Sequence, residues 1–415
     1  MPRRGRSGLY CAEVATETPV ESGPRHATWL ELFFDLVAVA GIGQLTHLLH
    51  HGPGAADVAL YLLLYLAFWM AWASICIYSN VAAGHTRTSV MLVAMLGLGV
   101  MAAAVPAMPQ RHATGFAAMY VILRLILAHT SGHGRIMVDW PSAQMQWGVL
   151  PWVISLWVPE PWKYWLWAAG LAVDMFLMFA VTGARMMAGA QQQLDRMLRR
   201  SDRFDGTRLP TLQALHADPE HLGERLGLYV IIVLGEGVIS VIEAVGGSDW
   251  NARVLITGFG AFVVLTELWA LTLNYGFIPR MMSGGNPADV VPRQHVMAQH
   301  CWNTGAIATI VAGLGLVVEH HDDRVLPAGP GWVLCGGLAG YFLINGIGMI
   351  RSDAGARAIL FWPVPCAVLA VPLAMISAHV GVIGLVVGAA VLLVWPLLWE
   401  TLRRNGSGRA GDTAR

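Results

Sequence analysis

The sequence predicts an all-α integral membrane protein with about 12 transmembrane helices, arranged as two parallel six-helix repeats. Hydrophobic residues make up 56% of the 415 residues and charged residues only 13%, a balance outside the range of soluble proteins. Apolar runs of about 20 residues, the length that crosses a bilayer, recur along the chain. Basic residues gather in alternate loops between these runs, which is typical of multi-pass proteins.

The composition also argues against several other classes of protein. The net charge is zero, so no overall field favours nucleic acid, and we expect no nucleic-acid partner. The five cysteines are scattered and form no CxxC or other metal-ligand spacing. We therefore expect no cofactor and no metal. The expected partners are membrane lipid and a small-molecule or lipid-like substrate, and the sequence does not define an oligomeric state.

The apolar runs can be followed in order from the N-terminus. The fifth, "WGVLPWVISLWVP", is short and carries prolines, and the eleventh contains "WPVPC", so both are expected to be kinked or partly unwound. The twelve runs begin near Thr28, Ala56, Thr88, His112, Gln144, Trp162, His221, Trp250, Gln294, Gly329, Ala358 and His379.

The basic residues predict the orientation in the cell membrane. One side has few of them, namely Arg111, Lys163, Arg253 and Arg324. The other side has the N- and C-terminal arginines, Arg87, Arg135, a cluster from Arg185 to Arg208, Arg280, Arg293, Arg351 and Arg357. Because cytoplasmic loops carry the excess of basic residues, both termini are predicted to be cytoplasmic.

A long polar connection divides the runs into two sets of six. We expect a cytoplasmic tail (1–27), a first repeat (28–182), a basic cytoplasmic linker (183–220), a second repeat (221–403) and a cytoplasmic tail (404–415). A faint internal similarity supports the repeat: "ELFFDLVAVAGIGQL" at Glu31 aligns with "ERLGLYVIIVLGEGVI" at Glu224, and "YVILR" at Tyr120 with "YFLIN" at Tyr341. An even number of helices in each repeat makes the two halves parallel.

Two of these stretches carry a family resemblance. "ELFFDLVAVAGIGQLTHLL" is similar to the ELFFDLVFV signature of the bacterial low temperature requirement A (LtrA) family, and "HLGERLGLYVIIVLGEGVISV" is close to its HLxERxGLxxIIxLGE pattern. The resemblance covers almost the whole membrane region and implies a polytopic membrane protein. It implies little chemistry, because the family is named for a growth phenotype.

The chain departs from the family pattern at several positions. Gly237 stands where the family commonly has a serine, and the loop "YSNVAAGHTRT" lacks the usual acidic residues. In "LWALTLNY", Asn274 replaces the aspartate of the family. If these positions serve a shared activity, it is expected to be altered or specialised here.

Charged residues inside a bilayer are costly unless they are paired or hydrated, so each is a candidate functional residue. Glu31 and Asp35 lie four apart and share one helix face. Asp35 lies about 10 Å and Arg124 about 9 Å from the same membrane surface, so we predict an ion pair between them. This pair serves either to fix the helix register or to take part in function.

The other candidates come from the second half and from the aromatic residues. Glu236 lies about 18 Å deeper than Glu224, close to the midplane, between Gly235 and Gly237. A carboxylate at that depth could exchange protons near neutrality, and its counterpart in the first repeat is Gly43. Glu224 and Arg225 suit a structural role at a helix start. The remaining candidates for binding or coupling are Asp174, Glu267, Trp72, Trp269 and Asn274.

Two functions fit these features. The first is a secondary transporter or permeation protein for a small or amphiphilic solute, since two parallel halves with a midplane acid match alternating-access designs. The alternative is an intramembrane enzyme on a lipid or isoprenoid, with Asp35 or Glu236 as general acid and tryptophans around a carbocation, as in terpene-cyclase-like chemistry. A closed aromatic pocket favours the enzyme, and a polar path to both faces favours transport.

Overall fold

The computed structural model describes residues 26–49, 54–82, 87–108, 111–131, 136–138, 147–181, 218–275, 293–351 and 356–412, together with a few short pieces between 188 and 215. Most of the predicted N-terminal tail and of the predicted basic linker lie outside the described residues. Those two expectations therefore stay predictions.

Helices make up nearly all of the described structure. Two three-residue strands, β1 (Ile136–Val138) and β2 (Gln213–Leu215), pair in parallel. Leu271–Tyr275 forms a π-helical turn after α10. The helices are α1 (Trp29–Leu45), α2 (Ala55–Ala82), α3 (Thr88–Ala104), α4 (Ala113–Ser131), α6 (Val149–Ser155), α7 (Trp162–Ala180), α9 (Pro219–Gly246), α10 (Ala252–Ala270), α12 (Arg293–Glu319), α13 (Ala328–Arg351), α14 (Ala356–Phe361) and α15 (Pro363–Asp412).

The described helices fit an α-helical, multi-pass membrane protein. Seven helices of the described part are long and apolar enough to cross a membrane, so the expected count of 12 is not confirmed. The fifth apolar run forms only the short α6, in agreement with its prolines. The last two runs are joined in α15, where Gly381 has a φ of 66° that interrupts the helix. Only glycine adopts that conformation readily, so the break occurs there.

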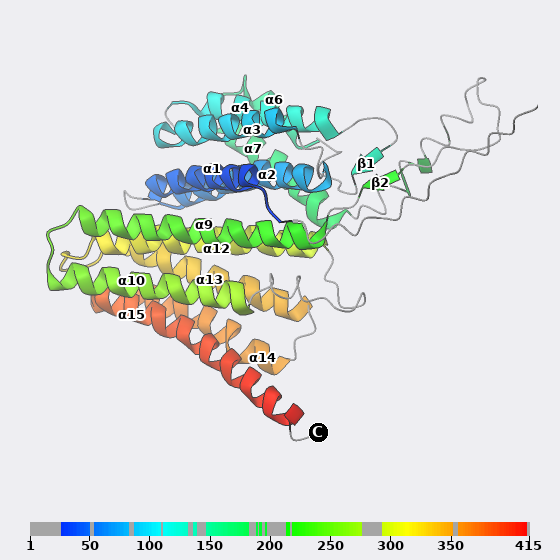
Figure 1. Ribbon diagram of the computed structural model, residues 1–415. Coiled ribbons are helices and arrows are strands. Elements are labelled where there is room, and N and C mark those ends of the chain that lie inside the picture. Colours follow the sequence, from blue (N-terminus) through cyan, green and yellow to red (C-terminus); the bar gives the residue numbers. More distant parts are fainter. Residues whose placement is uncertain are drawn as a thin grey trace, which may run out of the picture.

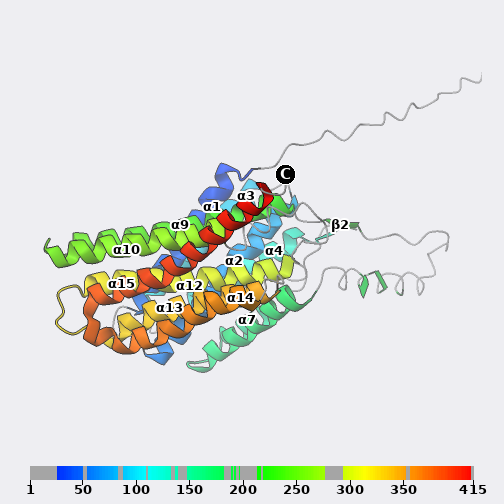
Figure 2. The ribbon, with the colours of Figure 1, turned by 90° about the horizontal axis from the view of Figure 1, so that it is seen from below.

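The helices lie side by side and form layers (Figure 1). Helices α3, α4, α6 and α7 occupy one side, and α10, α13, α14 and α15 occupy the other. Between them, α1 and α2 from the first half of the chain face α9 and α12 from the second half, a contact that we call the central interface. Figure 2 shows the same bundle from below, with α9 and α12 again next to α2.

Glycines set the closest helix packing in the second half. A Cβ at Gly313 of α12 would lie 2.6 Å from the backbone of Leu334 in α13, and one at Gly337 would lie 2.8 Å from the backbone nitrogen of Ile310. Neither contact leaves room for a side chain. Helices α12 and α13 therefore meet backbone to backbone, as small residues permit in membrane proteins.

Candidate functional site

Two helix caps bring the first turns of α1 and α9 into the same region. The Thr28 hydroxyl accepts from the Glu31 amide at 3.3 Å, and the Glu31 carboxylate accepts from the Thr28 amide at 2.9 Å, which is a complete capping box. At the start of α9, the Asp218 carboxylate accepts from the amides of Glu220 and His221. Both helices therefore begin with fixed geometry and project polar side chains from their first two turns.

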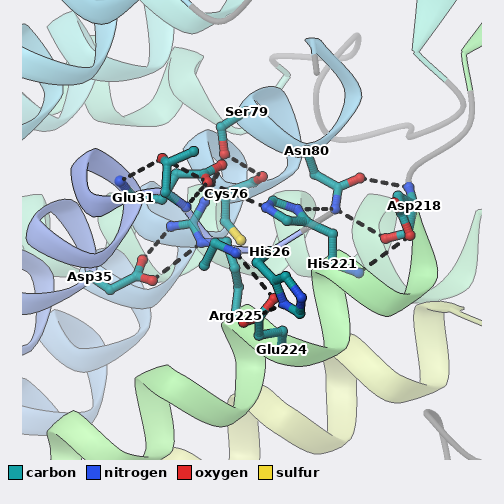
Figure 3. Close-up of polar contacts among 12 residues, drawn as sticks. His26, Glu31, Asp35, Cys76, Ser79, Asn80, Asp218, His221, Glu224 and Arg225 are labelled. Carbon is teal, nitrogen blue, oxygen red and sulfur yellow. Dashed lines mark hydrogen bonds and ion pairs between the residues drawn. The ribbon is translucent and has the colours of Figure 1, made fainter. Parts of the chain in front are cut away.

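Those side chains form a charge ladder between α1 and α9, made of Glu31, Asp35, His221 and Arg225 (Figure 3). His221 Nε2 lies 3.3 Å from Glu31 Oε2. One turn further along both helices, Arg225 Nε donates to Asp35 Oδ2 at 3.2 Å and Arg225 Nη2 donates to Asp35 Oδ1. The two pairs match in register because each helix supplies partners four residues apart on one face.

The first half of the chain completes the coordination of Arg225. Its Nη1 donates to Ser79 Oγ of α2 at 2.7 Å and lies 3.6 Å from Glu31 Oε1. Trp72 of α2 donates its indole N–H to Asp35 Oδ1 at 2.7 Å. Asp35 and Arg225 have no exposed surface. A buried guanidinium of α9 is thus held by side chains of α1 and α2, across the central interface.

Asn80 fixes the tautomer of His221. The Asn80 side chain accepts from the Asp218 amide at 2.7 Å and donates to the Asp218 carbonyl at 3.1 Å. These two hydrogen bonds fix which atom of the Asn80 amide group is the oxygen and which is the nitrogen. Its Nδ2 then faces His221 Nδ1 at 2.9 Å as a donor. His221 Nδ1 must accept, and the ring proton is on Nε2, from which it donates to Glu31. The imidazole is therefore neutral in this arrangement.

The predicted ion pair between Asp35 and Arg124 is wrong. Arg124 of α4 pairs with Asp174 of α7 at 3.1 Å and donates to Ser74 of α2 at 2.7 Å. Distance along a helix gives the depth of a residue but not the neighbour that its helix faces. Asp35 and Arg124 do lie on helices of the same half, but α9 brings Arg225 against Asp35, and Asp174 provides the partner that Arg124 needs.

An aromatic layer covers the deeper side of the charge ladder. The rings of Trp72 and Tyr229 lie 4.1 Å apart, and Trp72 stacks on His300 of α12 at 5.4 Å. Trp69 donates to His300 Nδ1 at 3.1 Å, and His300 Nε2 lies 3.2 Å from the Leu226 carbonyl. His300 is therefore also a neutral imidazole, with a ring orientation fixed on both sides. Trp72, a predicted candidate for binding or coupling, belongs to this layer.

Glu236 lies further along the same interface. Its carboxylate lies against Gly43 of α1, where an added Cβ would overlap it. Gly43 is the residue that aligns with Glu236 in the internal similarity. The side chain is partly buried, and within the described residues no hydrogen bond or ion pair holds its carboxylate. Glu236 is thus a carboxyl group deep in the helix bundle without a fixed partner there.

The remaining predicted residues do not join the charge ladder as a group. Glu224 accepts from the Ala27 amide at 3.1 Å and so ties the segment before α1 to α9. Glu267 lies in a separate groove between α10 and α15. Trp269 is 46% exposed, and Asn274 lies exposed in the π-helical turn.

A groove between the two halves lies beyond the charge ladder. It has a volume of about 530 Å³ and is lined by α2, α12 and α13. The hydroxyl groups of Tyr61 and Thr309 lie 3.4 Å apart, and Tyr65 donates to the Cys301 carbonyl at 2.7 Å. These polar atoms are largely occupied by one another, and the rest of the lining is apolar, including Trp302 and Trp332. The groove suits an apolar or amphiphilic molecule.

Sequence reasoning missed several members of this site. His221 stands four residues before Arg225, the same spacing that identified Glu31 and Asp35, so that signal was present in the sequence. Ser79, Asn80 and His300 carried no comparable signal. Their roles depend on which helices become neighbours.

The fold and the site define a multi-pass membrane protein with a fully buried charge network between two helical halves. A family model described as "Bacterial low temperature requirement A protein (LtrA)" matches residues 26–395, and the chain belongs to this family. No curated protein and no solved structure matches the chain.

Proposed function

We propose that this protein is a secondary transporter for a small or amphiphilic solute, whose two helical halves move against each other at the central interface. One observation carries the proposal. The same interface holds an apolar groove of about 530 Å³ toward one end and a charge ladder at the other. A transporter open to one side needs such a cavity together with a closed opposite end.

The helix neighbours support a parallel repeat. Helix α1 packs on α2 and α3, as α9 packs on α10 and α12. Helix α3 packs on α4, as α12 packs on α13. The aligned residues Gly43 and Glu236 meet between α1 and α9. This is the arrangement expected if a pseudo-two-fold axis along the membrane normal relates the halves and passes near these two helices.

In the proposed orientation, the protein lies in the cell membrane with both termini cytoplasmic. The charge ladder then closes the cytoplasmic end of the central interface, because α1 and α9 begin there. Opening that end requires Arg225 to leave Asp35 and Ser79. Water that enters at the same time replaces these contacts, which limits the cost of separating the charges.

Glu236 is the proposed proton-coupling residue. It lies deep in α9, where hydrocarbon disfavours a permanent charge, and no ion pair within the described residues fixes its state. Gly43 lets its carboxyl group reach into the interface. Movement of α9 against α1 would change the water access of this group, and that change couples proton exchange to transport.

The enzyme alternative has weaker support. An acid that protonates an isoprenoid must carry a proton and face the substrate. Asp35 instead accepts hydrogen bonds from Nε and Nη2 of Arg225 and from Trp72, so both of its oxygens act as acceptors, as in a carboxylate. The rings of Trp72, Tyr229 and His300 pack against one another beside it.

Two measurements test transport. In the first, proteoliposomes containing a trapped pH dye receive a panel of neutral and cationic amphiphiles. We expect at least one to drive proton movement in the wild type and not in Glu236→Gln. Full pH-driven flux in Glu236→Gln would remove the proton role.

The second measurement needs no known solute. A cysteine replaces Gly336, an exposed residue of the groove lining, in a chain otherwise free of cysteine, and a membrane-impermeant maleimide is added from either side. We expect labelling from the outside in this chain, and increased labelling from the cytoplasm when Asp35→Asn is added. Equal cytoplasmic labelling with and without Asp35→Asn would contradict the closing role of the ladder.

A further inference from the structure

A second groove lies on the outer surface of the bundle, between α10 and the part of α15 that follows Gly381. Its volume is about 580 Å³. The helices come close at Gly260, where an added Cβ would lie 2.6 Å from a methyl group of Val386. On either side of this contact the walls are apolar, with Phe259 on α10 and Val391 on α15. The groove is apart from the central interface.

One acid interrupts this apolar lining. Glu267 is the only charged residue among the residues described as lining the groove, and it is 8% exposed. Its Oε2 atom is buried and has no hydrogen-bond partner within the described part of the chain. Trp395 offers no donor to it, because its indole N–H donates to the Phe361 carbonyl at 2.8 Å. A buried carboxyl oxygen without a partner costs several kcal/mol in hydrocarbon.

The groove is about as long as one alkyl chain of a membrane lipid. It follows α10 from Ile256 to Glu267, which at the helical rise is about 17 Å. Half of a hydrocarbon core is about 15 Å. Glu267 thus lies at one end of an apolar groove that is as long as one alkyl chain of a lipid.

We propose that this groove binds a long-chain membrane alcohol, with the chain along α10 and α15 and the hydroxyl group on Glu267. A hydroxyl group can donate to a carboxylate and accept from a carboxylic acid, so it satisfies Glu267 in either state. An ammonium group would bring a second charge out of water and require its own desolvation. The apolar walls bind the alkyl chain of the alcohol, and Glu267 binds its hydroxyl group.

Photolabelling of the purified full-length protein tests this site. The probe is hexadecanol that carries a mid-chain diazirine and a terminal alkyne, and a matched probe lacks only the hydroxyl group. We expect the alcohol probe to label peptides of α10 and α15, and unlabelled hexadecanol to compete. Loss of the hydroxyl contact in Glu267→Leu is expected to lower this labelling about five- to tenfold, whereas Glu267→Gln retains more of it.

A pair of bulky variants makes the test independent of Glu267. Val391→Trp fills the groove and should abolish labelling, while Val368→Trp, at an exposed position of α15 before Gly381 and outside the lining, should not. Equal labelling of Val391→Trp and wild type, or equal labelling by the probe without a hydroxyl group, would overturn the proposal. So would a phospholipid that remains bound in mass spectra and is not displaced by hexadecanol, or crosslinks that place a second copy over Val391.

Discussion

Arg225 of α9 donates to both carboxylate oxygens of Asp35 in α1, although 190 residues separate them in the chain. Each residue has its own signature stretch, so the bond joins the two motifs that identify the family. It also joins the two halves of the bundle. Breaking this bond leaves a charge buried away from water. The bond is therefore either a permanent contact between α1 and α9, or one that breaks only when the two helices separate and water enters.

The pairing of Asp35 can be tested with double-mutant cycles. Asp35→Asn or Arg225→Gln alone should lower the free energy of unfolding by about 3–5 kcal/mol. Arg225→Gln leaves the buried Asp35 carboxylate without its ion-pair partner, and Asp35→Asn leaves Arg225 with only the longer ion pair to Glu31, at 3.6 Å. Their combination should cost at least about 2 kcal/mol less than the sum. Thermal and denaturant unfolding in detergent measure these terms. The matched cycle of Asp35→Asn with Arg124→Gln should be additive within about 0.5 kcal/mol, and a large coupling there would support the rejected pair instead.

The neutral state of the His221 imidazole can be tested by NMR spectroscopy. Solid-state NMR of ¹⁵N-histidine-labelled protein should show His221 as the Nε2–H tautomer, because Asn80 donates to Nδ1. In Asn80→Asp the new carboxylate accepts instead of donating, so the ring should gain a proton on Nδ1 and become an imidazolium. His300 serves as an internal reference, since its contacts do not change. An imidazolium signal for His221 in the wild type would contradict the arrangement.

Gly43 sets the position of the Glu236 carboxyl group. Gly43→Ala places a Cβ where that carboxyl group lies, so the flexible Glu236 side chain must turn aside. Proton coupling should be disturbed, and the unfolding free energy should fall by only about 0.5–1.5 kcal/mol. Gly235→Ala is the control, because its Cβ meets nothing within 4 Å and alanine favours the helix. Adding Glu236→Ala should restore the unfolding free energy that Gly43→Ala loses. Failure of the rescue would show that another neighbour causes the loss.

Two adjacent glycines of α13 should respond in opposite ways. Gly337→Ala forces a Cβ to 2.8 Å from the backbone nitrogen of Ile310, which cannot turn aside, so the melting temperature should fall markedly. Gly336→Ala meets nothing within 4 Å and should leave stability unchanged or raise it slightly. Melting curves of both variants in the same detergent decide this. Similar losses in both would contradict the close approach of α12 and α13.

Some of this could be predicted from local patterns. Apolar runs located the helices because crossing hydrocarbon demands them, and the short proline-containing run became the short α6. The spacing of Glu31 and Asp35 identified a polar helix face, and the motifs identified the family. The number of crossings was not settled in this way, since Ala358–Arg403 is one interrupted apolar helix.

The sequence by itself determined that this is a helical membrane protein of the LtrA family with a small number of buried charges. Which charges meet was decided only by the tertiary structure. Depth along a helix follows from counting residues, but lateral neighbours follow from how all the helices pack. The packing pairs Asp35 with Arg225 and Arg124 with Asp174. It also places Glu236 against Gly43 and Glu267 at the end of an apolar groove.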